Sequence, residues 1–159
     1  MRKTDTEQEA TSGFLGNGNI ERQNIYNVTF EKSIPNSIYN HIEKKIADNV
    51  RAWDISAQGD QSIIAWYVDS EIRNGTYKIH IATNEQVPGG SEITNTEIFA
   101  NQNSSYLFNY IGSSDKCTAT EVITNIELLD VNSVTNMSYM FSNTGYKAMT
   151  SLDLGAKFS

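Results

Sequence analysis

The chain is poor in the residues that mark several common classes of protein. It has one cysteine among 159 residues, so no disulfide can form within it. It has no run of eighteen apolar residues, so no membrane-spanning helix is expected. Its formal net charge is −7, and no lysine- or arginine-rich cluster offsets this. Nucleic acid and anionic membrane surfaces are therefore disfavoured as partners, because both are negatively charged.

Motifs that carry catalysis are also missing. The sequence has no nucleophile elbow, HExxH, CxxC or closely spaced carboxylate pair. We therefore expect no catalytic residue, no cofactor and no metal. Cys117 lies in a polar stretch and is predicted to be exposed or half-exposed. His80 is expected on the polar face of a strand without partners, and Asp54 is interpreted as the cap of a turn rather than a Ca²⁺ ligand with Asp60.

The residues that are present predict a β-rich fold. Hydrophobic residues make up only 38% of the chain, but aromatic residues make up 10% and short apolar runs recur, so the composition is not that of a disordered protein. The length favours one domain. Residues 1–13 are polar without periodicity and are predicted to be a disordered lead.

Alternating or continuous apolar residues predict several strands. Residues 25–30 alternate around Tyr26 and Val28, and residues 62–68 followed by 76–82 predict a β-hairpin. Isoleucines at every fourth position predict a short amphipathic helix over 37–48. A core is expected at the apolar positions of these elements, namely Phe30, Trp53, Ile64, Trp66, Ile79, Ile81 and Phe108.

The second half of the chain repeats itself in fragments. The tripeptide 139–141 echoes 106–108, and the segment 150–154 echoes 124–128. The second offset is shorter than the first, and a polar insertion near 115–121 explains the difference. Each unit is predicted to be a short strand followed by one or two helical turns, the first turns lying at 104–111 and the second near 134–141. A further strand is expected at 149–154.

These residues carry a family resemblance. The segment VTNMSYMF, followed by TSLDLGAKF, resembles the repeat of BspA-like, mycoplasma-lipoprotein-type leucine-rich-repeat proteins of bacterial surfaces. Residues 14–30, 53–68 and 98–108 resemble the segment that precedes the first repeat. The resemblance implies an α+β, β-rich fold, in which an N-terminal cap domain (14–111) leads into a leucine-rich-repeat-like solenoid (112–159).

The resemblance also implies a function. It suggests a non-enzymatic cell-surface or secreted protein that acts in adhesion or protein interaction, with export and anchoring segments outside this chain. The partner would be a protein or a glycan, and the open C-terminal end could also support self-association. The expected interaction surface consists of Met137, Tyr139, Tyr146, Leu152 and Leu154.

Two other classes of function stay open. Exposed aromatic side chains, with Trp53 and Trp66 as the best candidates, could make the chain a carbohydrate-binding module. A small hydrolase, less favoured, would need two carboxylates that are distant in sequence but share a cleft. Exposure of both tryptophans would favour the carbohydrate-binding module over the protein-interaction module.

Overall fold

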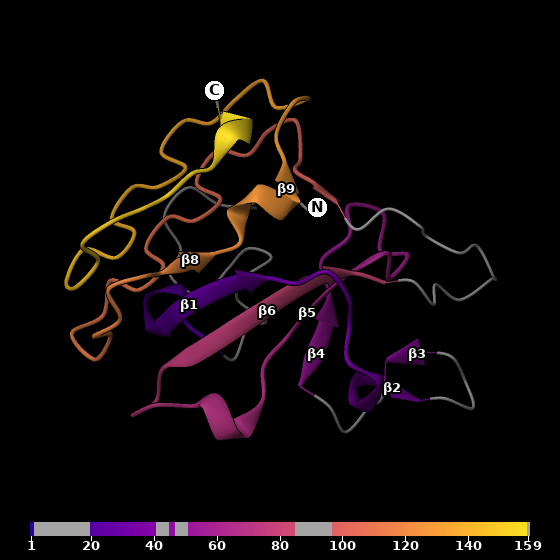
Figure 1. The fold of residues 1–159 in the computed structure, drawn as a ribbon, viewed down its shortest axis with the longest axis horizontal. Coiled ribbons are helices and arrows are strands. Elements are labelled where there is room, and N and C mark those ends of the chain that lie inside the picture. The colour runs from indigo at the N-terminus through magenta and orange to yellow at the C-terminus, as the bar shows by residue number, and fades with distance from the viewer. Residues whose placement is uncertain (2–19, 41–44, 47–50, 85–96, 159) are drawn as a thin grey trace.

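The computed structural model describes residues 1, 20–40, 45–46, 51–84 and 97–158 (Figure 1). Most of the predicted lead (1–13) lies outside these residues. The strands are β1 (Ile25–Phe30), β2 (Tyr39–Asn40), β3 (Lys45–Ile46), β4 (Ala52–Asp54), β5 (Ile63–Trp66), β6 (Tyr77–Thr83), β7 (Ile98–Phe99), β8 (Ile123–Thr124) and β9 (Leu129–Asp130). Short 3₁₀ turns are η1 (Arg22–Asn24), η2 (Asn36–Ile38), η3 (Asp69–Glu71), η4 (Ile126–Leu128) and η5 (Ala156–Phe158).

A mixed five-stranded sheet organises the fold, in the order β4-β5-β6-β1-β8. Strands β4, β5 and β6 pair antiparallel, which confirms the predicted hairpin of β5 and β6. Strand β1 then pairs parallel with both β6 and β8. All six residues of β1 are buried, because it has a strand on each side and is covered on both faces.

The two faces of the sheet build two hydrophobic clusters. Alternate residues point to opposite faces, so Ile79 and Ile81 join the main cluster with Phe30 and Phe108, whereas Ile64 and Trp66 join the smaller one. The predicted core is therefore confirmed at six of its seven positions. The exception is Trp53, which is only partly buried and packs against the main cluster.

The predicted helix over 37–48 is wrong where the structure describes it. Residues 36–38 form η2, and the chain then continues into β2, which pairs antiparallel with β3. Ile38 and Tyr39 are adjacent and both buried in the smaller cluster. Burying two consecutive side chains beside the sheet outweighs the weak helical periodicity of the isoleucines. Residues 41–44 and 47–50 lie outside the described part of the chain.

The described residues are β-rich and contain no α-helix, so the helical turns predicted near 104–111 and 134–141 are also wrong. Both segments are instead series of tight turns, which we call ribbon 1 (103–113) and ribbon 2 (136–145). The two ribbons lie side by side, and a parallel bridge joins Asn103 to Asn136. Two stacked ribbons are not a solenoid, and no longer array is present among the described residues.

Two further predictions are corrected. Residues 149–154 form no strand; Leu152 and Leu154 instead pack against the main cluster. Cys117 is buried at 3% exposure, because the turn from Ser114 to Cys117 folds the thiol against the carbonyl of Gln23, 3.4 Å from Sγ. Burial raises the pKa of this thiol.

Candidate interaction surface

Ribbon 1 is a chain of overlapping turns that advances two residues at a time. The N–H groups of Leu107, Asn109 and Ile111 donate to the carbonyls of residues three positions earlier, at 3.2–3.3 Å. The backbone is left-handed at Tyr106 (φ 59°) and Tyr110 (φ 62°). A left-handed residue cannot continue an α-helix, so these two residues keep the segment a ribbon.

Alternate N–H groups of ribbon 1 cross to ribbon 2. Tyr106, Phe108 and Tyr110 donate to the carbonyls of Ser138, Met140 and Ser142, at 3.0, 2.8 and 3.0 Å. Odd-numbered donors thus stabilise the ribbon, and even-numbered donors bind its neighbour. The division resembles a parallel β-ladder, in which alternate groups of a strand face one neighbour.

Contacts made by side chains reinforce the backbone pairing of the two ribbons. The rings of Tyr106 and Tyr139 stack with centroids 5.1 Å apart, and those of Phe108 and Phe141 stack at 5.4 Å. Thr144 also donates through its hydroxyl to the carbonyl of Phe108, at 2.7 Å. The tripeptides 106–108 and 139–141 are therefore similar in sequence because their aromatic rings stack on each other in the structure.

The outer edge of ribbon 2 is a row of free donors. Ribbon 2 repeats the internal pattern, since Met140, Ser142 and Thr144 donate to carbonyls three residues earlier. By that pattern, the outward N–H groups belong to Met137, Tyr139, Phe141 and Asn143. Within the described part of the chain, no hydrogen bond is made by these four groups. An edge of this kind is a template for another segment of backbone.

The opposite edge, on ribbon 1, is closed by a buried arginine. Arg22 is 2% exposed and donates through Nε to the Asn109 carbonyl at 2.9 Å. Its Nη2 donates to the carbonyls of Tyr106 at 2.9 Å and Leu107 at 2.6 Å. Burial lowers the pKa of this guanidinium to about 10.

The carbonyls that Arg22 binds are the ones that a preceding ribbon would need. Leu107 and Asn109 occupy the ribbon 1 positions that correspond to Met140 and Ser142, which accept hydrogen bonds in ribbon 2. The amine of Met1 likewise donates to the carbonyl of Phe99, at 2.6 Å. The stack therefore has polarity, with a capped carbonyl edge and an open N–H edge.

The structure separates the five predicted surface residues into two groups. Met137, Tyr139 and Tyr146 are exposed, at 40%, 64% and 71%. The first two lie on the open edge of ribbon 2, and Tyr146 directly follows the ribbon. Leu152 and Leu154 are partly buried against the core and do not form part of an exposed surface.

The tryptophans chosen for carbohydrate stacking are not exposed. Trp66 is 3% exposed and stacks on the ring of His80, with centroids 5.3 Å apart. Trp53 is half-buried, and its ring lies 6.4 Å from that of Tyr67. The buried ring of Trp66 therefore offers no face to a sugar ring.

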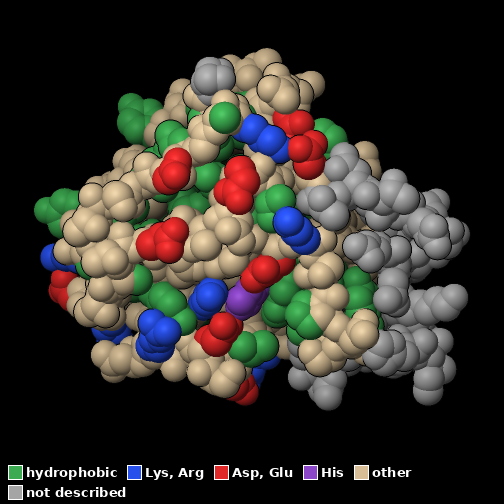
Figure 2. Space-filling view, in the orientation of Figure 1, with side chains coloured by type: hydrophobic (Ala, Val, Ile, Leu, Met, Phe, Trp, Pro, Cys, Tyr) green, Lys and Arg blue, Asp and Glu red, His purple; other side chains and the backbone are tan. Residues whose placement is uncertain are grey.

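His80 has two partners that the sequence analysis missed. Its Nδ1 lies 2.8 Å from Glu31 Oε1, and its Nε2 lies 2.6 Å from Glu71 Oε2. Figure 2 shows the histidine, in purple, with red acidic side chains on either side. The histidine thus ties the residue after β1 to η3.

The loop between Asp54 and Asp60 is held by backbone bonds. Asp54 accepts from the N–H groups of Ser56 at 2.8 Å and Gln61 at 3.1 Å, which agrees with its interpretation as a cap. Asp60 accepts from Ser62 at 3.0 Å, and hydrogen bonds to this carboxylate lower its pKa. Among the described residues, no group of three or more potential metal ligands is found.

Comparisons with known proteins add no relative. No family model, curated protein or solved structure matches the chain. Among the described residues, none of the helical segments is long and apolar enough to cross a membrane.

Proposed function

We propose that the chain is a non-enzymatic interaction module of a bacterial cell-surface or secreted protein, of the leucine-rich-repeat kind that its sequence resembles. It would act in adhesion by presenting the open edge of ribbon 2 to a partner. The observation that carries the proposal is the asymmetry of the stack. Arg22 occupies the carbonyl edge, whereas the four N–H groups of ribbon 2 are left for a partner.

The polarity of the stack favours one kind of partner. Two copies of the chain that met edge to edge would bring donors against donors, and a head-to-tail contact would find its acceptors already bound by Arg22. Self-association along this edge is therefore disfavoured. The suitable partner presents a row of carbonyls two residues apart, as a further ribbon or an extended peptide does.

Exposed side chains beside the edge would add affinity and specificity. Met137 and Tyr139 flank the free N–H groups, and Tyr146 follows them. Methionine and tyrosine are common in protein interfaces, since both offer large contact areas that adapt to a partner. Many such weak contacts along a longer stack would add together.

Amide hydrogen exchange tests the proposal. One sample is the chain itself, and the second carries two further repeat units, patterned on ribbons 1 and 2, after residue 158. The amides of Met137, Tyr139, Phe141 and Asn143 should exchange fast in the first sample and slowly in the second. The amides of Leu107, Asn109 and Ile111 are the internal control and should be protected in both.

The same two samples should then be tested for binding to an array of matrix proteins and glycans. We expect Tyr139→Lys to weaken binding by the unextended chain and to have little effect on the longer chain, whose added repeats cover the edge of ribbon 2. Fast exchange at all four amides in a folded extended chain would rule out the edge as a docking site. Turnover of a peptide or glycan substrate by either sample would favour the hydrolase hypothesis instead.

A further inference from the structure

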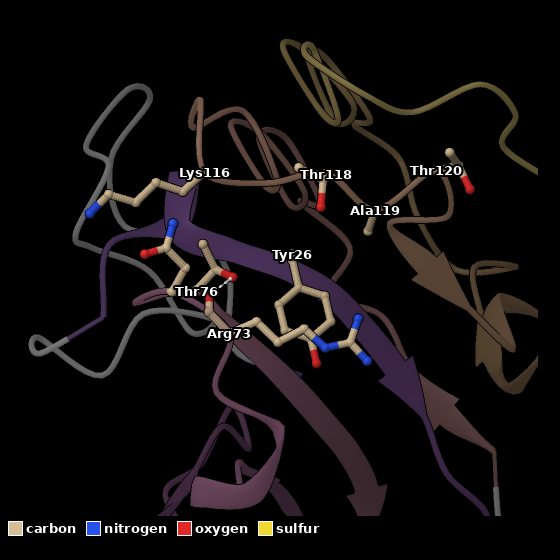
Figure 3. A pocket seen from close by; sticks show the side chains of 8 residues that line it. Tyr26, Arg73, Thr76, Lys116, Thr118, Ala119 and Thr120 are labelled. Carbon is tan, nitrogen blue, oxygen red and sulfur yellow. Dashed lines mark hydrogen bonds between the residues drawn. The ribbon is translucent and has the colours of Figure 1, made fainter.

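A polar hollow lies away from the ribbons, where the turn from Arg73 to Thr76 faces the loop 114–121 (Figure 3). Its volume is about 380 Å³. Arg73 and Lys116 are the charged residues among its described lining, and no carboxylate lines it. This is unusual in a chain with a formal net charge of −7. Figure 3 shows the two cations toward opposite ends of the hollow, with Thr118 and Thr120 along one side.

Neither cation is neutralised by the protein. Asp115, which directly precedes Lys116 in sequence, pairs instead with Lys147 at 2.8 Å. In the described part of the chain, Arg73 and Lys116 take part in no salt bridge. The Arg73 guanidinium lies over the ring of Tyr26, 4.8 Å from its centroid. The ring holds the cation in place without removing its charge.

The frame of the hollow is fixed by hydrogen bonds. Arg73 and Thr76 exchange backbone bonds of 3.0 and 2.9 Å around a two-residue turn, in which Asn74 (φ 50°) and Gly75 (φ 74°) are left-handed. Lys116 Nζ lies over this turn, 3.9 Å from the position that a Cβ on Gly75 would take. The floor is fixed too, because the Tyr26 hydroxyl donates to the Glu71 carbonyl at 2.9 Å.

The hollow continues into a second one of about 410 Å³. The two share Tyr26, Arg73, Ala119 and Thr120. The second adds Lys78 from β6 and also two carboxylates, Glu71 and Glu121. The charge of Lys78 is partly compensated, since its amine lies 3.9 Å from a carboxylate oxygen of Glu71. The two carboxylates make the second hollow a poor site for an anion. The candidate site is therefore the first hollow, which we call the trough, with Arg73 and Lys116 as its cations.

We propose that this trough binds an acidic saccharide, such as a short chain of uronic acid residues. Arginine suits a carboxylate because its N–H groups bind both oxygens, and lysine supplies a point charge. Threonine hydroxyls and the Asn74 amide are suitable partners for sugar hydroxyls. The Tyr26 ring is already covered by Arg73, so recognition would rely on charge and hydrogen bonds and not on stacking.

The size and spacing of the trough argue against a small inorganic anion. A hollow of about 380 Å³ is larger than such an ion fills, and its two cations are set apart rather than gathered around one point. A ligand with several acidic groups would contact them in succession. The proposal is independent of the ribbon edge, so either can fail without the other.

Calorimetric titration tests the site with three probes, namely tri-galacturonate, neutral maltotriose and inorganic sulfate. We expect measurable binding of tri-galacturonate only. Arg73→Gln and Lys116→Gln should each weaken it about tenfold, the effect of losing one charge-assisted contact. Lys32→Gln is the matched control, because Lys32 is exposed beyond the other end of β1 and its loss changes net charge equally. It should leave the affinity unchanged.

Three results would overturn the proposal. They are equal binding of maltotriose and tri-galacturonate, equal weakening by all three variants, and sulfate binding as tight as that of the trisaccharide. Equal weakening would indicate a general charge effect, and the sulfate result would indicate an adventitious ion only. Arg73→Lys is the control for misfolding. It keeps the charge, so it should retain part of the affinity, and its melting temperature should be unchanged.

Discussion

Tyr106 and Tyr139 are far apart in sequence, yet their rings stack with planes only 8° from parallel. Both residues have a left-handed backbone, with φ of 59° and 56°. The same match holds for Gly112 and Gly145, at φ of 69° and 60°. Equivalent residues of the two ribbons therefore share an uncommon conformation, which indicates a true structural repeat.

A double-mutant cycle should detect this stack. Replacing Tyr106 and Tyr139 by leucine, singly and together, should give a coupling free energy of about 0.5–1.5 kcal/mol in urea unfolding. The backbone strain of a left-handed leucine cancels in the cycle. The control cycle pairs Tyr106 with Tyr146, which makes no stack with it, and should give no coupling. Equal coupling in both cycles would contradict the stack.

Arg22→Met should destabilise the chain strongly. Methionine preserves much of the volume but leaves the buried carbonyls of Leu107 and Asn109 without donors, which should cost about 3–5 kcal/mol. Arg22→Lys should recover only part of this, since an amine cannot reproduce the planar fork. Arg51→Met is the control, because Arg51 pairs with Asp69 at an exposed site, and its melting temperature should change little. A small effect of Arg22→Met would show that the cap is dispensable.

Gly145→Ala should be much more harmful than Gly155→Ala. Both glycines are left-handed, so each alanine carries about 1–2 kcal/mol of backbone strain. At Gly145 the new Cβ would also lie 2.3 Å from the Cβ of Met149, whereas at Gly155 its nearest neighbour would be 3.5 Å away. The clash should add about 1–3 kcal/mol. Equal melting temperatures for the two variants would contradict the tight turn at Gly145.

The buried thiol should make stability fall at alkaline pH. Burial raises the pKa of Cys117 above its usual 9.0, so the unfolded chain loses this proton first as the pH rises. The contribution of the thiol to stability is complete below the unfolded pKa and decreases above it. Cys117→Ala should remove part of that decrease in urea titrations between about pH 8 and 10.5. The Tyr26 hydroxyl, whose pKa is also raised by burial, accounts for a further part.

The sequence predicted the strands well, because alternating apolar residues report directly on burial. It predicted the ribbon repeat for a related reason, since stacked rings must recur at one spacing. It mistook the ribbons for helical turns, because both place apolar residues three apart. Only the left-handed Tyr106 and Tyr139 distinguish them, and tyrosine gives no signal for that conformation.

The second echo was aligned wrongly. Asn125 (φ 58°) and Gly155 (φ 64°) each precede a 3₁₀ turn, η4 and η5. In the structure Gly155 is thus the equivalent of Asn125, whereas the sequence echo had paired Asn125 with Ser151. Here a conformational match identifies equivalent residues better than the leucine spacing does.

The rest of the candidate site depends on contacts between distant residues. Arg22 reaches carbonyls 84–87 positions away, and His80 lies 49 residues from Glu31. Neither pairing leaves a local pattern, because a lone arginine before a strand usually remains in solvent. The buried position of Cys117 was missed for the same reason, since its partner is the carbonyl of Gln23.

The parallel pairing of β1 has a consequence for synthesis on the ribosome. Strand β1 leaves the exit tunnel first, but one of its partners is β6 and the other is β8, which ends at residue 124. At about 5–20 residues per second, roughly 5–20 s pass between the synthesis of β1 and that of β8. For this interval a strand that is buried throughout in the folded chain has at least one open edge. Nascent β1 is therefore a segment that a chaperone could protect during synthesis.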